Sequence, residues 1–321
     1  MSASGVAQAS IKLGKPSITV GTPEIRAAQR RMAQATILIP FAGTVAALIL
    51  AWIYGIGVLE IALLSGMYVL TSVGVELGFH RCFAHRAFET TRAMKVVLAA
   101  LGSMAAEGSV LYWAAGHRRH HAHSDTGDDP HSPHVRRLNT ADEPMGVIRG
   151  LWHSHVSWMM TDNVTNCTLF GKDILRDPLL NRIHTWYVPL ILSGLAIPAL
   201  VGGVVTGTWM GALNGFLWGG LVRMFLVHHS TWSNASFSHV YGTRPFATGD
   251  LSANNLWCAL PTFGASWQNN HHMFPSSAYL GLEWWQVDVG GWFVRIFSAA
   301  GLIWNVNGPP TPEMISARRL A

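Results

Sequence analysis

The chain has 321 residues, of which half are apolar and only 12% are charged. Soluble domains average about 25% charged residues, so this composition argues against a soluble protein and favours a membrane protein. The formal net charge is +5, and sixteen residues are histidine. The three cysteines, Cys82, Cys167 and Cys258, are too widely spaced for a disulfide framework or a cysteine metal site, and we expect them to be reduced.

The chain begins with a polar segment, residues 1–32, whose basic residues are Lys12, Lys15, Arg26, Arg30 and Arg31. Residues 33–54 carry no charge and are long enough to cross a hydrocarbon core of about 30 Å. Residues 57–79 form a second predicted span, with Glu60 and Glu76 near its two ends. The short connection between these spans predicts a helical hairpin.

Residues 93–112 are apolar but contain Glu107, and they lie between two histidine-rich stretches. If this segment crossed the membrane, those stretches would lie on opposite sides of it. We therefore predict an interfacial or protein-buried helix rather than a span.

A third and a fourth span are predicted at residues 185–206 and 209–229, joined by a turn at Gly207. The fourth span carries glycines four residues apart, Gly211, Gly215 and Gly219, which predict close helix packing. It also contains Arg223, which we expect to extend to the interface or to pair with Glu76 or Glu107.

Lysine and arginine are absent from the two short turns and, apart from Arg223, from the four spans. The positive-inside rule then places both termini and the intervening segment in the cytoplasm. The predicted fold is an all-α, multi-pass integral membrane protein with four transmembrane helices and a cytoplasmic helical cap. A single domain would cover residues 33–307, with its cap at 80–184 and 230–307, followed by a loose tail at 308–321.

Histidines gather at the predicted cytoplasmic boundary. His117, His120 and His121 are spaced i, i+3, i+4 and so share one helix face. His80 and His85 follow the second span, and His239 and the pair His271-His272 follow the fourth. Eight imidazoles exceed the needs of one ion, so we predict two metals; an all-nitrogen shell suggests iron and oxygen chemistry, with zinc as the alternative.

These histidines stand in motifs that resemble those of the membrane-bound fatty acyl desaturases of the acyl-CoA, stearoyl-CoA Δ9-like, bacterial type. GFHRCFAHR (residues 78–86) resembles the first histidine box, and GHRRHHAHSD (116–125) with GDDPHSP (127–133) resembles the second. The stretch 232–242 resembles the one that holds an isolated ligand histidine, and NNHHMFP (269–275) resembles the third box.

The resemblance implies an O2-dependent desaturase of a saturated fatty acyl chain. It implies two iron ions bound by eight histidines, with Gln268 as a further candidate ligand; the histidines are His80, His85, His117, His120, His121, His239, His271 and His272. No catalytic residue is expected apart from the metal ligands. Supporting roles around the metals are predicted for Asn234, His228, His229, Glu76 and Glu107. Leu64 and Tyr68 on the second span are predicted to close the substrate tunnel.

The sequence departs from the family at the third box, where Gln268 replaces the usual first histidine, and at Ala235, where the family usually has asparagine. Glu76 and Glu107 stand where related sequences usually have uncharged residues. A tolerated ligand exchange and an altered outcome, acetylenation or hydroxylation, both remain open. A metal transporter or a haem electron carrier is disfavoured, because the histidines lie at span ends rather than near mid-membrane.

Desaturation requires two electrons, and the chain has no dinucleotide-binding motif, cysteine cluster or His-Pro-Gly-Gly motif. We therefore expect a separate donor, which could be a ferredoxin, cytochrome b5 or a reductase. Arg118, Arg119, Arg136 and Arg137 could steer an acidic partner or contact anionic lipid. The substrate could be carried on CoA, on acyl carrier protein or on a membrane lipid, and no nucleic-acid partner is expected.

Overall fold

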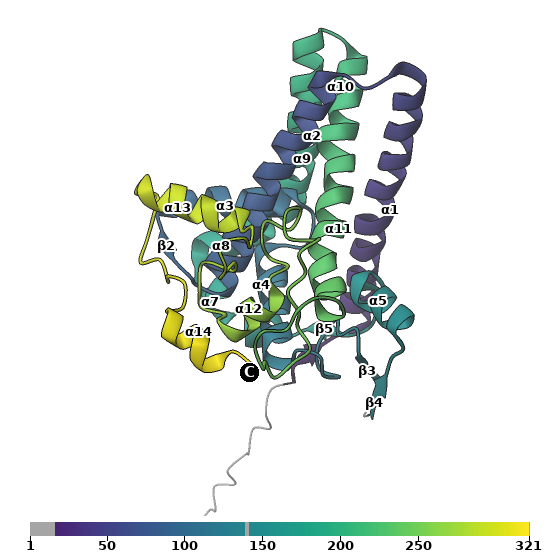
Figure 1. Cartoon of the computed structure of the whole chain (residues 1–321). Coiled ribbons are helices and arrows are strands. Elements are labelled where there is room, and N and C mark those ends of the chain that lie inside the picture. Colours follow the sequence, from purple (N-terminus) through teal and green to yellow (C-terminus); the bar gives the residue numbers. More distant parts are fainter. Residues whose placement is uncertain (1–16, 139–140, 321) are drawn as a thin grey trace, which may run out of the picture.

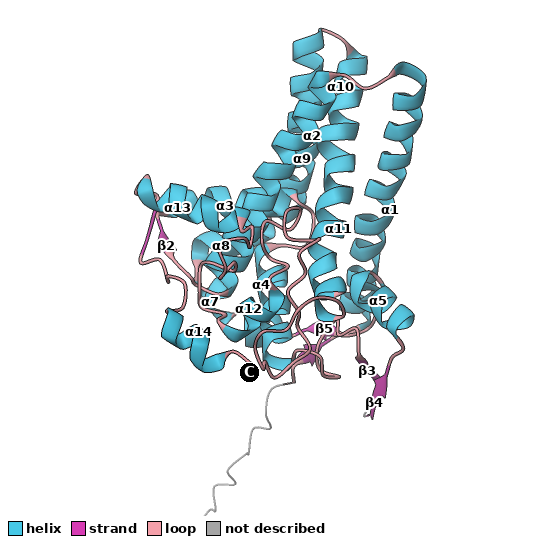
Figure 2. Ribbon diagram, viewed as in Figure 1, coloured by secondary structure: helices cyan, strands magenta, loops and turns pink. Residues whose placement is uncertain are grey.

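The computed structural model describes residues 17–138 and 141–320, so the first half of the predicted N-terminal segment, with Lys12 and Lys15, lies outside the described residues. A bundle of long helices rises from a cap of short helices and loops (Figures 1 and 2). The C-terminus lies in the cap, at the end of the molecule opposite the two tight interhelical turns (Figure 1).

Within this described part, four helical stretches are long and apolar enough to cross a membrane, which confirms the four predicted spans. They are α1 (Pro23–Tyr54); α2 (Val58–Val73) continued by η1 (Gly74–Ala84); α9 (Tyr187–Thr206); and α10 (Trp209–Gly215) continued by η3 (Phe216–Val222), α11 (Arg223–Ala235) and η4 (Phe237–His239). The helices are longer than the apolar runs predicted from the sequence. The second therefore includes His80, and the fourth includes His239.

Local sequence explains where these helices begin and end. The Thr22 side chain accepts a hydrogen bond from the backbone N–H of Ile25, and Pro23 occupies the first turn of α1, where its missing N–H is not needed. Gly55 (φ 81°) ends α1, and Gly207 (φ 65°) makes the turn after α9. Both are positive-φ positions that favour glycine.

The predicted glycine stripe packs against α9. A Cβ atom on Gly215 would lie 2.1 Å from the carbonyl oxygen of Pro198, and one on Gly211 would lie 2.7 Å from that of Gly202. The two backbones can approach this closely only because these positions lack side chains.

Arg223 is fully buried and does not pair with Glu76 or Glu107, contrary to the sequence prediction. Its guanidinium donates hydrogen bonds to the carbonyl oxygens of Met104, Gly194 and Gly219, at 2.7, 3.0 and 3.2 Å. The arginine thus joins α11, α9 and the end of α3 through backbone groups, which sequence patterning does not reveal.

The cap is built from short helices: α3 (Arg92–Met104), α4 (Val110–His123), α5 (Val147–His155), η2 (Ser157–Met160), α6 (Cys167–Phe170), α7 (Lys172–Arg176), α8 (Pro178–Thr185), α12 (Gln268–Met273), α13 (Val289–Ala299) and α14 (Pro312–Arg318). The apolar segment predicted at 93–112 is divided between α3 and α4, and it does not form one of the long spanning helices. Ala106 and Gly108 have positive φ and break it at Glu107.

Three antiparallel strand pairs tie distant segments to the cap. They are β1 (Thr19–Val20) with β5 (Val164–Thr165), β2 (Glu89–Thr90) with β6 (Ile303–Trp304), and β3 (Val135–Leu138) with β4 (Ala141–Pro144). The first pair holds the segment before α1 against the cap.

The predicted loose tail is wrong for the described residues after Gly308. They include α14, and beyond it Arg319 pairs with Glu283 while the Leu320 N–H donates to the Pro245 carbonyl at 2.8 Å. Contacts between distant segments therefore order a stretch whose proline-rich composition predicts irregular structure.

Candidate metal centre

Helix α4 presents three histidines on one face, as their spacing predicts. Ser109 caps this helix, since its hydroxyl accepts a hydrogen bond from the Tyr112 N–H at 3.3 Å. Three further segments surround α4: η1 with His80 and the following His85, η4 with His239, and α12 with His271 and His272. The π-helical form of η1 is typical of functional sites, because it displaces side chains from the regular helical register.

The first histidine group contains His80, His85, His117 and His271, and the one ring nitrogen that each offers lies within 4.8 Å of the other three. The Nε2 atoms of His80 and His271 are 3.0 Å apart, and those of His85 and His117 are 2.7 Å apart. His121 adjoins this group, with its Nε2 2.9 Å from the Nε2 of His271.

The second histidine group contains His120, His239 and His272, again with one ring nitrogen from each within 4.8 Å of the others. The Nε2 atoms of His239 and His272 are buried and have no hydrogen-bond partner among the described residues. The ring of His121 stacks on that of His272, with centroids 4.4 Å apart, so the two groups are contiguous. The structure thus brings together the eight histidines singled out in the sequence.

Carboxylates contact the Nδ1 atoms of four histidines and so orient their rings. Nδ1 of His80 lies 3.0 Å from Glu76, and Nδ1 of His120 lies 3.0 Å from Asp129. In the second group, Nδ1 of His239 is 2.9 Å from Asp125 and Nδ1 of His272 is 2.5 Å from Asp250. A carboxylate that accepts from Nδ1–H fixes the tautomer and leaves the Nε2 lone pair free for a metal.

Sequence reasoning assigned no role to Asp125, Asp129 or Asp250. The first two follow the second histidine box within eight residues of His121, a spacing that could have suggested them as orienting groups. Asp250 lies in a loop 22 residues before His272 and carries no comparable local signal.

Electrostatics keeps most of these imidazoles neutral. Burial, followed by the neighbouring imidazoles, holds the pKa values of His117, His121 and His271 well below the usual range. For His120, burial acts in the same direction, but Asp129 outweighs it and raises the pKa. Neutral imidazole is the form that binds metal ions.

These features fit a bound metal pair. In the second group, the unpartnered, buried Nε2 atoms of His239 and His272, with their Nδ1 atoms held by carboxylates, are the arrangement expected around a metal ion. The all-imidazole donor set suits iron, zinc, copper or nickel. A third group, His120 with Asp129 and His131, shares His120 and its carboxylate, so it is an extension of the second histidine group.

A cavity of about 490 Å³ adjoins the two groups. His80, His117 and His120 line it, together with Gln268 and Asn234. Residues from α1, α8, α9 and the segment from α5 to β5 complete its walls. Cavities of this size, mostly apolar with a few polar groups, typically bind small molecules.

Gln268 and Asn234 both face this cavity with unsatisfied oxygens. Gln268 Oε1 and Asn234 Oδ1 are buried and lack hydrogen-bond partners among the described residues. Gln268 begins α12, three residues before His271. Its free oxygen is available either to a metal or to a substrate.

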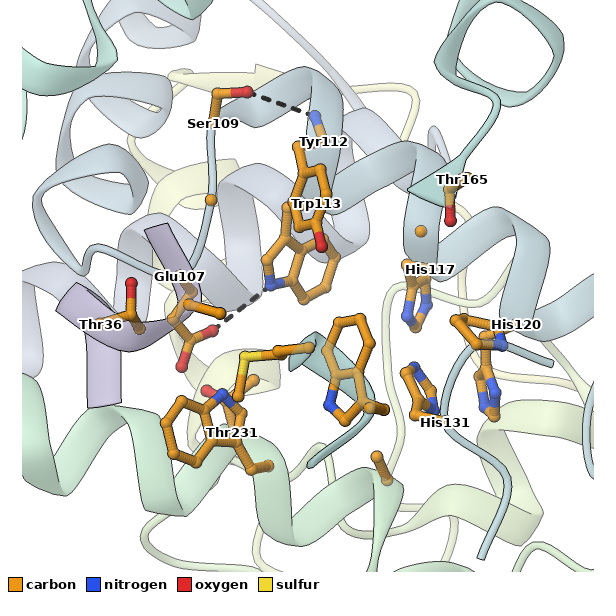
Figure 3. Close-up of a pocket in the computed structure, with 18 of the residues that line it drawn as sticks. Thr36, Glu107, Ser109, Tyr112, Trp113, His117, His120, His131, Thr165 and Thr231 are labelled. Atoms are coloured by element: carbon orange, nitrogen blue, oxygen red, sulfur yellow. Dashed lines mark hydrogen bonds between the residues drawn. The ribbon is translucent and has the colours of Figure 1, made fainter. Parts of the chain in front are cut away.

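Glu107 lies on the opposite side of the cavity. Figure 3 shows Glu107 and Thr231 on one side, His117, His120 and His131 on the other, and Trp113 between them. Trp113 donates from Nε1 to Glu107 Oε2 at 3.4 Å and stacks on His117 with ring centroids 5.0 Å apart.

The predicted supporting residues separate into two sets. Glu76 contacts a ligand candidate, His80, as described above. Glu107, His228 and His229 do not act in this way: Glu107 bonds Trp113, His228 Nε2 bonds the Ala105 carbonyl at 2.7 Å, and His229 bonds His155 at 2.9 Å.

The predicted tunnel residues need correction. Leu64 packs in an apolar cluster between membrane helices, and Tyr68 donates its hydroxyl hydrogen to the Pro261 carbonyl at 2.6 Å. Neither residue lines the cavity, which lies on the side of α4 that faces α1 and α11. Position along the second span alone did not indicate which of its faces borders the cavity.

Three of the four arginines that were predicted to steer a partner make contacts within the cap. Arg119 is fully buried and donates to Asp128, Asn163 and Thr165. Arg118 makes two hydrogen bonds to Asp173, and Arg137 pairs with Asp128 and Asp142. Arg118 and Arg119 therefore act within the cap, and Arg137 is paired at its surface.

Comparison with known proteins decides the family. Residues 56–288, which include all eight histidines, match the family described as "Fatty acid desaturase". The chain belongs to the fatty acid desaturase family. It is therefore an oxidoreductase that desaturates fatty acyl chains, and its four apolar helices fit a membrane protein.

The names of its relatives refer to acyl chains on different carriers. It is 46% identical over 95% of its length, and 94% of the relative's, to the hex-5-enoyl-[acyl-carrier protein] acetylenase of Moorena producens. It is 33% identical to the sn-1 stearoyl-lipid 9-desaturase of Anabaena variabilis over 74% of this chain and 80% of that protein. It is 31% identical to a probable acyl-CoA desaturase of Schizosaccharomyces pombe over 77% and 49% of the two chains.

Proposed function

We propose that this desaturase holds two iron ions, one in each histidine group, and uses O2 to oxidise an acyl chain lying in the cavity. The observation that carries this proposal is the pair of histidine groups at the cavity wall, where the buried Nε2 atoms of His239 and His272 are free and their Nδ1 atoms are held by carboxylates. Iron supplies the oxidising power needed to remove hydrogen from an unactivated methylene, which ordinary acid–base groups cannot do.

The protein's own residues contribute position and a dry environment. The cavity walls hold two adjacent carbons of the chain next to the histidine groups, so that geometry selects the site of reaction. The overall change is –CH2–CH2– + O2 + 2 e⁻ + 2 H⁺ → –CH=CH– + 2 H2O. The two electrons come from a separate donor, a ferredoxin, cytochrome b5 or a reductase.

The proposed orientation places the cap, the metal centre and both termini in the cytoplasm. Support comes from the charge distribution, since the turns at Gly55–Gly57 and Gly207–Thr208 carry no lysine or arginine, whereas the cap is rich in arginine and also contains Lys95 and Lys172. An electron donor and a carrier-bound substrate would then reach the cap from the same compartment. The substrate carrier could be CoA, acyl carrier protein or a membrane lipid.

Metal analysis combined with product analysis tests this function. Purified protein should contain about two iron atoms per chain, and a host that expresses it should accumulate new monounsaturated acyl chains. A matched variant, His239→Ala, should lose the products and part of the iron. Stoichiometric zinc with no oxidised product would overturn the proposal.

A second candidate outcome is acetylenation, the oxidation of an existing double bond to a triple bond. It is favoured by the relative from Moorena producens, whose similarity extends over nearly the whole chain, and by Gln268, an amide in the cavity wall where the family usually has histidine. Supplying the host with saturated and with terminally unsaturated acyl chains separates the two outcomes. Alkynes formed only from the unsaturated chain would make acetylenation the principal reaction.

A further inference from the structure

The cavity contains one acidic side chain whose hydrogen-bonding capacity is not used by the metal centre. Glu107 lies in the loop between α3 and α4, and its contact with Trp113 engages only Oε2. The residue is partly accessible to the cavity, but its Oε1 atom is buried and has no partner among residues 17–138 and 141–320. An unpaired buried polar atom is costly, so its persistence requires an explanation.

The protonation state of Glu107 follows from its surroundings. Burial raises the pKa of Glu107 to about 8, although the nearby polar groups of Thr231 and Trp113 act in the opposite direction. At neutral pH the side chain is therefore a neutral carboxylic acid with a single O–H. Because Oε2 accepts from Trp113, the O–H is available at Oε1.

We propose that Glu107 is a specificity-determining residue that donates a hydrogen bond from Oε1 to an acceptor on the acyl substrate. The inference rests on the proposed function, in which the acyl chain occupies this cavity. The acceptor is either the carbonyl oxygen of the ester or thioester, or the π electrons of a double bond already in the chain. A fully saturated stretch of chain offers no such acceptor.

The position of Glu107 supports this role. Its hydrogen-bond partner Trp113 contacts His117, so Glu107 contacts the acyl chain at a fixed distance from the first histidine group. The titratable or charged groups on the neighbouring elements are Tyr68, Glu76, Tyr112, His184, Tyr187, Arg223 and His228. The guanidinium of Arg223 is occupied by backbone carbonyls, as described above, and therefore does not neutralise Glu107.

Binding to the metal-loaded enzyme without O2 tests the proposal, because no turnover then obscures the affinity. The probes are two acyl thioesters of equal length, one saturated and one with a terminal double bond. The proteins are wild type, Glu107→Gln, which retains a donor, Glu107→Leu, which removes it, and the control Glu60→Gln. Glu60 lies at the far end of α2, where both its oxygens are hydrogen-bonded to Gly57 and Asn214.

We expect Glu107→Leu to weaken binding at least tenfold for one or both probes, and Glu107→Gln to stay within about threefold of wild type at pH 7. An equal loss for both probes identifies the carbonyl as the acceptor, and a loss confined to the unsaturated probe identifies the double bond. Wild-type affinity should also fall between pH 7 and pH 9, while the Gln variant remains unchanged.

Unchanged affinities in Glu107→Leu, with no pH dependence in wild type, would overturn the role of Glu107. The wild-type pH series needs no substitution, so a poorly folding variant does not prevent the test. Failure of wild type to bind either probe would instead contradict the proposed function, because the cavity would then not hold the acyl chain.

Discussion

The two sides of the cavity bury ionisable groups in different ways. On the histidine side, meaning the two histidine groups and their carboxylates, His80, His120, His239 and His272 each have Nδ1 matched to an acid. On the Glu107 side, a single carboxyl faces the cavity with one weak hydrogen bond and one free oxygen.

The two sides therefore have different roles: the histidine side fixes the geometry of the metal ligands, and the Glu107 side contacts the substrate. Matched pairs fix the geometry of groups that must not move, at the expense of desolvating several charges. A solitary neutral carboxyl fixes little, but it can respond to whatever occupies the cavity. Substitutions on the histidine side should therefore change metal content, whereas those on the Glu107 side should change affinity and pH dependence.

The largest effect is expected from removing a ligand candidate. His239→Ala leaves two imidazoles in the second group, so we expect loss of about one metal per chain and an activity decrease of at least about 10³-fold. His85→Ala leaves three imidazoles with His121 beside them, and should retain more metal. Metal content by mass spectrometry checks both. Equal metal loss in the two variants would remove the distinction between the groups.

The next largest effect is expected from neutralising a carboxylate that orients a histidine. Asp250→Asn keeps the shape but removes the negative charge that orients His272, and should weaken metal binding about 10- to 100-fold. Competition with a chelator measures this affinity. Asp142→Asn, an exposed acid bound to Arg137, is the control and should leave the affinity unchanged. An Asp250→Asn protein that retains metal as wild type does would contradict the orienting role.

Glu107 should produce a pH-dependent change in stability. Its folded pKa, about 8, lies above the unfolded value near 4.5, so the folded state retains a proton that the unfolded state loses. The free energy of unfolding therefore decreases as pH rises from about 4.5 to 8, by up to about 1.4 kcal/mol per unit. Glu107→Gln removes this dependence and should be more stable than wild type at pH 7.5.

Thermal unfolding in detergent at pH 5 and pH 7.5 measures this difference. The stabilisation by Glu107→Gln should be small at pH 5 and larger at pH 7.5. A difference independent of pH would mean that Glu107 is ionised in the folded protein.

Substitutions of Gln268 test whether its side-chain oxygen is a metal ligand. Gln268→His adds an imidazole beside His271 and His272, and should tighten metal binding several-fold and alter the ratio of products. Gln268→Leu removes the free oxygen and should weaken metal binding if that oxygen is a ligand. Metal retention and product profiles identical in all three proteins would restrict Gln268 to substrate contact.

The smallest effect is expected at Tyr68, outside the cavity. Tyr68→Phe removes the hydrogen bond to Pro261 and should cost about 1 kcal/mol of stability without changing the lengths of the chains accepted. Profiling of acyl products checks this. A shift in chain length would restore the tunnel role predicted from the sequence.

Periodicity and spacing predicted the most regular parts of this protein. The four spans, the hairpin turns and the shared face of His117, His120 and His121 follow from local patterns of apolar residues, glycines and histidines. The orienting role of Asp250, the burial of Arg119 and the ordered tail at Arg319 were not predicted. Each depends on contacts between segments far apart in the chain, which have no local periodicity.

The sequence by itself determined four apolar spans and eight histidines in motifs that resemble those of the fatty acyl desaturases, because apolar length and residue type are properties of the chain. Only the tertiary structure decided how the eight histidines divide between two groups and which carboxylates orient them. It also placed Glu107, rather than Leu64 or Tyr68, in the cavity wall. The physical reason is that burial and pairing are set by which elements pack together, and a side chain's charge and role depend on that packing.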